Sequence, residues 1–249
     1  RYRYGEFLVE GVRNINQAIR NGWQFTSLLY SPETPLSRWA QEVLDTVSCD
    51  THYQLSANLM QELSGKTDTS ELLAILRMRP DDPALLHDSP CPLYILFDRP
   101  SNHGNLGSII RSADALGADG LILTGHGVDL YQPEVITASM GSFFNLPAIR
   151  MADNDTVFAW IARQRDLHPG FQVIGTTAHK QLNITQVDFR LPTLLMIGNE
   201  TEGLCRAFKE GCDLLATIPM ADTSSASSFN VACAATVMMY EVCRQRAQE

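Results

Sequence analysis

The stretch that decides the fold reads Asn105-Leu106-Gly107-Ser108-Ile109-Ile110-Arg111. It follows an apolar run over residues 93–97 and a small polar loop, a pattern that predicts a buried strand leading into a helix over 105–117. At about 100° per residue, the apolar side chains share one face of this helix, and Asn105, Ser108 and Arg111 share the other. An arginine there, one turn past a glycine-containing entry, suits a phosphate clamp. For this segment alone, a solvated arginine on a surface helix is the simpler interpretation.

Two later segments follow the same plan of strand, polar turn and helix. The first reads Leu194-Leu195-Met196-Ile197-Gly198-Asn199-Glu200-Thr201-Glu202-Gly203-Leu204. In the second, Ile218-Pro219-Met220 ends a strand, and Ser228-Phe229-Asn230-Val231-Ala232 begins a helix rich in small residues. Ligand-binding turns are expected where parallel strands end. For Glu200 the alternative is that its carboxylate caps the helix predicted at 202–210.

The second part of the chain alternates between apolar strands and amphipathic helices. Strands are predicted near 93–97, 121–124, 146–150, 171–176, 194–198 and 214–218, and helices near 105–117, 132–141, 153–165, 202–210 and 228–246. Continuous apolar strands in such alternation are typical of a parallel sheet covered by helices on both faces. The predicted fold class is therefore α/β.

The first 79 residues predict a smaller α/β unit. Its strands are expected near 7–11, 28–30 and 72–78, and its helices near 11–21 and 35–46. Residues 80–92 contain four prolines and three aspartates, which disfavour a helix or a central strand and suit an exposed linker. We therefore predict one domain at 1–79, a linker at 80–92 and a second domain at 93–249.

The composition indicates an ordinary globular protein of the cytoplasm. The chain has 249 residues, of which 45% are hydrophobic and 19% charged. No apolar run approaches the roughly 20 residues that a membrane span needs, and the polar opening Arg1-Tyr2-Arg3-Tyr4 does not look like a signal peptide. The six cysteines form no CxxC pair and no zinc-type spacing with histidine. We expect free thiols in a reducing cytosol, no membrane partner and no metal.

The charge pattern gives mixed indications about RNA binding. A net charge of −9 argues mildly against it, because phosphate contacts need local positive charge. Arginines nevertheless cluster near the N-terminus and at the end of the first predicted domain, and Arg99 and Arg111 bracket the first motif. The candidate RNA-binding residues are Arg13, Arg20, Arg77 and Arg79.

A dinucleotide-binding loop is a poor interpretation of Gly125-His126-Gly127. The third glycine of that motif is missing, since Leu130 occupies its place, and no helix is predicted to start there. A turn is expected instead. This argues against a NAD-dependent enzyme and against the common methyltransferase type with a glycine-rich loop after its first strand.

In this order, the three segments resemble the signature motifs of SpoU-type RNA 2′-O-ribose methyltransferases, the TrmH family of the knotted SPOUT class. Ala138-Ser139-Met140-Gly141 and Leu146-Pro147 are similar to a connecting segment of that family, and Glu62-Leu63-Ser64-Gly65 matches a phrase of its ribosomal-protein-like RNA-binding domain. The resemblance covers nearly the whole chain. Relatives carry a short segment before this point, which is compatible with a native start upstream of Arg1.

The resemblance implies a C-terminal trefoil knot, a homodimer formed through the C-terminal domain, and S-adenosylmethionine as cofactor. The substrate would be a ribose 2′-hydroxyl in structured ribosomal or transfer RNA. The implied catalytic residues are Asn105, Arg111, Glu200, Ser228 and Asn230. The implied cofactor-binding residues are Gly198, Asn199, Glu200, Gly203, Ile218, Met220, Phe229 and Asn230.

The third motif departs from the family pattern. Met220 and Ser228 are eight positions apart where six are usual, Asp222 stands where glycine is common, and Ser225 and Ser227 are alternatives to Ser228. We nevertheless interpret the chain as an S-adenosylmethionine-dependent RNA 2′-O-methyltransferase, and the altered motif and the acidic charge support one alternative, an RNA-binding protein of the same fold that has lost catalysis. A knotted methyltransferase that acts on a base nitrogen is a further alternative, against which the pattern of Asn105, Arg111 and Ser-x-Asn speaks.

Overall fold

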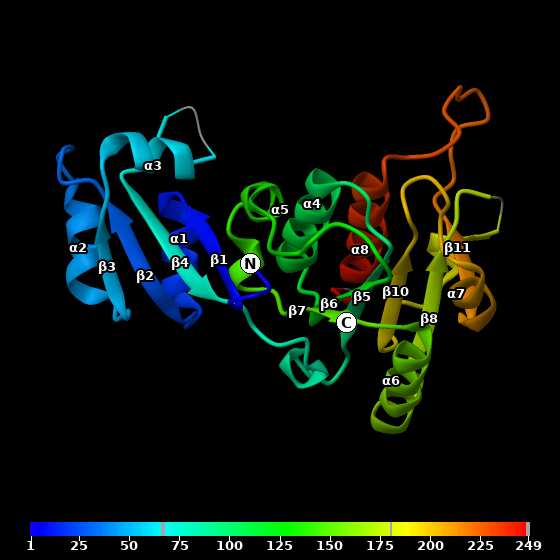
Figure 1. The fold of residues 1–249 in the computed structure, drawn as a ribbon. Helices are drawn as coiled ribbons and strands as arrows, with labels where there is room; N and C mark the ends of the chain where they lie inside the picture. The colour runs from blue at the N-terminus through cyan, green and yellow to red at the C-terminus, as the bar shows by residue number, and fades with distance from the viewer. Residues whose placement is uncertain (66–67, 180, 248–249) are drawn as a thin grey trace.

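The computed structural model describes residues 1–65, 68–179 and 181–247, which form two α/β units lying side by side (Figure 1). The small unit contains a four-stranded sheet of order β1-β4-β2-β3, and the large unit a seven-stranded sheet of order β7-β6-β5-β10-β8-β11-β9. The predicted α/β class is confirmed, with a small N-terminal unit ahead of a larger parallel sheet.

The small unit has more elements than the sequence predicted. They are β1 (Glu6–Glu10), α1 (Val12–Arg20), β2 (Phe25–Tyr30), α2 (Arg38–Thr46), β3 (Thr51–Gln54), α3 (Ala57–Leu63) and β4 (Leu72–Arg77). The missed elements are β3, whose side chains are almost all exposed, and α3, which buries only Met60. Neither has an apolar face that a periodicity argument could detect.

The large unit contains the predicted alternation. Its elements are β5 (Leu93–Asp98), α4 (His103–Ala115), β6 (Gly120–Thr124), α5 (Pro133–Ala138), β7 (Ala148–Met151), α6 (Asn154–Leu167), β8 (Gln172–Thr176), β9 (Leu182–Asn183), β10 (Thr193–Ile197), α7 (Arg206–Gly211), β11 (Leu214–Thr217) and α8 (Val231–Arg246), with 3-10 turns η2 (Ser142–Phe144) and η3 (Ile184–Gln186). Every strand pairing in this sheet is parallel.

Three boundaries in the large unit differ from the predicted ones by three residues or more. Helix α7 begins at Arg206 rather than 202, because residues 199–203 close a tight turn. Helix α8 begins at Val231 rather than 228, because the side chain of Asn230 caps it. Helix α5 ends at Ala138 rather than 141, and Met140 and Gly141 then take positive φ angles of 53° and 96° that no helix tolerates.

Side chains of the central strands alternate between two apolar layers. In β5, Ile95 and Phe97 pack with α4 and α8 on one face, while Tyr94 and Leu96 pack with α6 and α7 on the other. All residues of β5, β6 and β10 are buried. This is the two-sided coverage that continuous apolar strands predict.

The predicted linker is only partly exposed. A 3-10 turn, η1 (Pro83–Leu85), forms within residues 80–92, capped by the side chain of Asp82. Leu86 is buried against the sheet, and the carboxylate of Asp81 accepts a hydrogen bond from the backbone N–H of Arg150 at 2.8 Å. Residues 80–92 therefore pack along the large unit instead of running free.

Two features of the described residues bear on the class of protein. None of the helices in that part of the chain is long and apolar enough to cross a membrane. The same residues contain no group of three or more His, Cys, Asp or Glu side chains that could hold a metal ion.

The glycine of the first motif allows α4 and α5 to pack closely. A Cβ on Gly107 would lie 2.5 Å from the Cβ of Ala138 and 2.6 Å from the carbonyl oxygen of Val135. Overpacking of this kind typically costs roughly 1–3 kcal/mol, whereas alanine is otherwise about 1 kcal/mol better than glycine inside a helix.

We therefore predict that Gly107→Ala lowers the free energy of unfolding, measured by chemical denaturation. Ser108→Ala, at the next and exposed position of α4, is the control and should change stability little. A more stable Gly107→Ala protein would contradict the close packing described for this pair of helices.

Candidate active site

The first two motifs meet at the carboxyl ends of neighbouring strands. Strands β5 and β10 pair in parallel with Phe97 opposite Ile197, so the loop over residues 99–102 and the turn over 198–204 leave the sheet side by side. The third motif approaches the same edge through the start of α8. This edge is where open parallel sheets place their ligands.

The carboxylate of Glu200 joins the second motif to the first. It accepts hydrogen bonds from the backbone N–H of Ser101 at 3.0 Å, the Ser101 hydroxyl at 2.6 Å, the backbone N–H of Asn102 at 3.1 Å and Nδ2 of Asn105 at 3.3 Å. The alternative that Glu200 caps the helix predicted at 202–210 is thus wrong. Glu200 instead satisfies donors at the entry to α4, and α7 starts at Arg206 without a side-chain cap.

The environment keeps Glu200 ionised. Its partial burial disfavours the charged form, but the hydrogen bonds from Ser101 and Asn105 outweigh burial, and the pKa of Glu200 lies below its ordinary value. The positive end of α4 also favours a negative charge at this place. Glu200 is therefore an orienting anion at neutral pH and not a proton donor.

Asn105 and Asn230 extend this contact to the third motif. Oδ1 of Asn105 accepts a hydrogen bond from Nδ2 of Asn230 at 3.2 Å. Oδ1 of Asn230 in turn caps α8 by accepting from the backbone N–H groups of Ala232 and Cys233 at 2.9 and 3.3 Å. The chain Glu200–Asn105–Asn230 therefore links three segments that are far apart in the sequence.

Asp98, which the sequence analysis did not predict as a site residue, holds the segment after β10 against the end of β5. It is 2% exposed and accepts hydrogen bonds from the Thr124 hydroxyl at 3.1 Å and the backbone N–H of Cys205 at 2.8 Å. It also pairs with Arg99, which forms a second ion pair with Glu202. Both ion pairs of Arg99 therefore lie within the site. The sequence signal that could have identified Asp98 is an acidic residue at the end of an apolar strand.

The turn after β10 needs glycine at two positions. A Cβ on Gly198 would lie 2.3 Å from the backbone nitrogen of Leu204, and Gly203 has a φ of +69°. The turn closes through two backbone hydrogen bonds between Asn199 and Gly203, of 3.1 and 3.0 Å. Its backbone is therefore held at the surface of the adjoining cavity.

A cavity of about 340 Å³ opens beside this turn. Eight predicted residues line it, namely Gly198, Asn199, Glu200, Gly203, Ile218, Met220, Ser228 and Phe229. Asn230 does not line the cavity. Its side chain donates a hydrogen bond to Asn105, which in turn donates one to the lining residue Glu200. Such a volume, with an apolar wall and a few convergent polar groups, is typical of small-molecule sites.

Several lining residues were not predicted. Thr176 ends β8, Thr177, Ala178 and His179 follow it, and Lys209 comes from α7. The four residues at the end of β8 were missed because this strand lies between β10 and β11 in the sheet, although it precedes both in the chain. The sequence alone carried no signal for that strand order.

The remaining predicted residues stay outside this network. Arg111 is exposed on α4 and forms no ion pair with another described residue. It stands about 9 Å along the helix axis from Asn105, at 1.5 Å per residue. Arg13, Arg20 and Arg77 are exposed on the small unit, whereas the guanidinium of Arg79 is half-buried over the ring of Trp23.

The contacts of Glu200 give a test that needs no ligand. Because its pKa is lowered in the fold, Glu200 stabilises the protein above its unfolded pKa, and this contribution is lost as the pH falls through the folded value. We predict that Glu200→Gln lowers the free energy of unfolding by about 1–3 kcal/mol at neutral pH, and that the difference shrinks in acid. Glu210→Gln, which breaks only a surface pair with Arg206, should have a small effect in urea titrations at both pH values.

Comparison with known proteins places the chain in a family. The family model for SpoU rRNA methylases matches residues 92–240, and that for the SpoU L30e-like domain matches residues 1–74. The chain is 44% identical to a 23S rRNA (uridine(2479)-2′-O)-methyltransferase of Streptomyces viridochromogenes, covering 99% of this chain and 85% of the relative. It is 30% identical to a 23S rRNA (guanosine-2′-O-)-methyltransferase, RlmB, of Coxiella burnetii, over 82% and 74%.

Solved structures give the same result. The SpoU methyltransferase AviRb from Streptomyces viridochromogenes, in complex with AdoMet, superposes with a TM-score of 0.94 at 44% identity, covering 99% of this chain and 92% of that one. An AdoMet-bound rRNA methyltransferase from Sinorhizobium meliloti has a TM-score of 0.83 at 28% identity, covering 98% and 89%. With all three motifs gathered at one edge of a parallel sheet, the chain belongs to the SpoU rRNA methylase family.

Proposed function

We propose that the chain transfers a methyl group from S-adenosylmethionine to a ribose 2′-hydroxyl of ribosomal RNA. The observation that carries this proposal is the hydrogen-bonded chain Glu200–Asn105–Asn230 at the mouth of the cavity. It is supported by the relatives, whose names describe 2′-O-methyltransferases of 23S rRNA.

The cavity fits the cofactor. The absence of side chains at Gly198 and Gly203 lets backbone groups approach a ligand closely, and Ile218 and Met220 supply apolar surface for an adenine ring. Bound S-adenosylmethionine supplies an electrophilic methyl group on a positively charged sulfur. The protein's part is to align that group with the hydroxyl for in-line displacement, and such alignment can contribute about 7–11 kcal/mol.

Arg111 is proposed as the residue that meets the reacting nucleotide. A guanidinium group donates hydrogen bonds and has no acceptor atom, so we assign Arg111 no role as proton acceptor. A fixed positive charge beside the ribose instead grips the phosphate and stabilises the alkoxide as it develops. In this scheme Asn105, Glu200, Ser228 and Asn230 orient the ribose and the cofactor.

Loss of catalysis is not favoured. The proposed site residues are present in full, and the longer serine-rich loop over residues 221–227 projects from the large unit (Figure 1), with Ser227 at its end lining the cavity. Methylation of a base nitrogen is not favoured either, since the relatives named above are 2′-O-methyltransferases.

We further propose a homodimer, a trefoil knot and a cytoplasmic location. Val237 and Tyr240 are 41% and 59% exposed beside a hollow between α4 and α8, which suits contact with a second copy. The knot is proposed because the family implies it, and it is compatible with a helix α8 that packs against α4 although the preceding strand, β11, lies beyond β10 and β8 in the sheet. All six cysteines are free thiols, as suits a reducing compartment.

Methyl transfer to 23S rRNA tests the function directly. Incubation with labelled S-adenosylmethionine, followed by ribose-methylation mapping, should give one modified nucleotide. Arg111→Ala should abolish transfer, and Arg111→Lys should also fail, because one ammonium cannot reproduce the planar fork. Arg163→Ala, an exposed arginine on α6 across the sheet, is the control, and a substantially active Arg111→Ala enzyme would remove Arg111 from the mechanism.

Calorimetry separates cofactor binding from catalysis. S-adenosylmethionine should bind at one site per subunit in the wild type and in Arg111→Ala with nearly equal affinity. Gly198→Ala should abolish binding because its Cβ collides with Leu204, and its melting curve shows whether the fold survives. Absence of heat and of thermal shift with the wild type at saturating ligand would support the RNA-binding alternative.

A further inference from the structure

Aromatic rings from both units meet in one buried cluster. Phe7 and Trp23 come from the small unit, and Tyr131, Phe143 and Phe144 from the large one, and each is at most 8% exposed. Ring centroids lie 4.8 Å apart for Phe7 and Tyr131, and 5.5 Å apart for Trp23 and Phe143. These five aromatic residues, together with Arg79, which follows β4, form what we call the interdomain joint.

The polar groups of the joint are satisfied across the boundary. Nε1 of Trp23 donates to the carbonyl oxygen of Phe144 at 2.9 Å. The Tyr131 hydroxyl accepts from the backbone N–H of Arg79 at 3.1 Å and is placed to donate to its carbonyl oxygen at 3.2 Å. The guanidinium of Arg79 lies 4.1 Å above the Trp23 ring and donates to the carbonyl oxygen of Asn21 at 3.0 Å.

The rings of the joint are as buried as those of a protein core. Burial raises the pKa of Tyr131 to about 12 and lowers the pKa of Arg79 from its ordinary value. Boundaries between domains of one chain are ordinarily polar and allow relative motion, whereas here one apolar core runs through both units.

Backbone contacts connect the joint to the active site. The loop that carries Tyr131 begins after β6, and the N–H of Val128 in this loop donates to the carbonyl oxygen of Pro100 at 2.9 Å. Pro100 immediately precedes Ser101, which holds Glu200. The two units also meet beside the joint at α1, where Arg13 and Gln17 pack against Gly141 closely enough that a Cβ there would lie 3.3 and 3.0 Å from their Cγ atoms.

We propose that the interdomain joint sets the distance between the exposed arginines of the small unit and the active site, and thereby selects which ribose is methylated. The inference rests on the proposed function and deepens it. Arg79 and Tyr131 are positioning residues in this scheme, since they act through the placement of the small unit. RNA held by Arg13, Arg20 and Arg77 then reaches the site at one spacing only, and small misplacements at a reacting centre cost as much as roughly 100-fold in rate.

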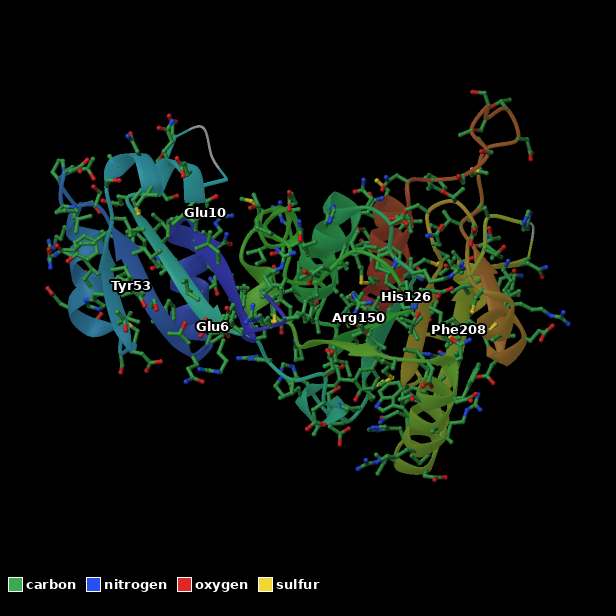
Figure 2. All side chains as sticks on the ribbon, in the orientation of Figure 1. Glu6, Glu10, Tyr53, His126, Arg150 and Phe208 are labelled. Carbon is green, nitrogen blue, oxygen red and sulfur yellow. The ribbon has the colours of Figure 1, made fainter. Side chains whose placement is uncertain are left out.

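Three variants damage the joint by increasing amounts. The first, Tyr131→Phe, removes the two hydroxyl contacts but keeps the ring. The second combines Tyr131→Phe with Arg79→Met and also removes the stacked cation. The third, Trp23→Leu, removes the central ring. Tyr53→Phe is the matched control, because Tyr53 lies on the edge strand β3, far from the large unit (Figure 2). Amide hydrogen exchange at residues 128–144 measures opening of the joint in each full-length protein.

The expected result is a graded loss of target selection. As exchange at the joint increases along the series, kcat on 23S rRNA should fall, by roughly tenfold or more in the most damaged variant that still folds, and methylation should spread to neighbouring nucleotides. S-adenosylmethionine affinity should not change, which separates misplacement from damage to the cofactor site. Tyr53→Phe should behave as the wild type.

Two outcomes would overturn the inference. One is single-site methylation at the wild-type rate in a variant whose joint exchanges freely. The other is failure of all three variants to increase exchange, which would show that these contacts do not hold the units together. Failure of the proposed function is a separate result, because it appears as absence of methylation by the wild-type protein before any variant is compared.

Discussion

The arrangement of the active site depends on the hydrogen bonds that the carboxylate of Glu200 accepts. Glu200 follows β10 in the chain, but its carboxylate accepts hydrogen bonds from the loop after β5 and from Asn105 of α4. Asn105 in turn holds Asn230 at the start of α8. Without that anion, Asn105 would lose its link to the turn after β10, although Asp98 and Arg99 would still hold the loop after β5 against that turn.

The distribution of charge at the site accounts for RNA binding by an acidic chain. Asp98, Glu200 and Glu202 stand close together, yet each is engaged by internal donors or by Arg99. These three carboxylates outnumber the one guanidinium beside them, so the positive charge offered to a phosphate is that of Arg111, exposed on α4. The net charge of −9 therefore says little about the surface that meets the nucleic acid.

The sequence predicted what depends on local pattern and missed what depends on the order of elements in space. Apolar continuity was sufficient to find β5, β6 and β10, and Gly198 and Glu200 were rightly expected at a strand end. The alternative that Glu200 caps the following helix came from chain order, whereas the parallel sheet brings α4 to this carboxylate. Thr176 to His179 were missed for the same reason. Arg79 was named as a candidate RNA-binding residue, and nothing nearby in the sequence indicates its contact with the ring of Trp23.

The strand order β10-β8-β11 also has a consequence for how the protein is made. The cavity is lined by the ends of β8, β10 and β11 and by the start of α8. Of these elements, β11 and α8 come after the others in the chain. A nascent chain that has emerged only as far as β10 can complete the small unit, since domains form from the N-terminus during synthesis. It has no pocket, however, so cofactor binding begins only when the C-terminal helix has been released and folded into place.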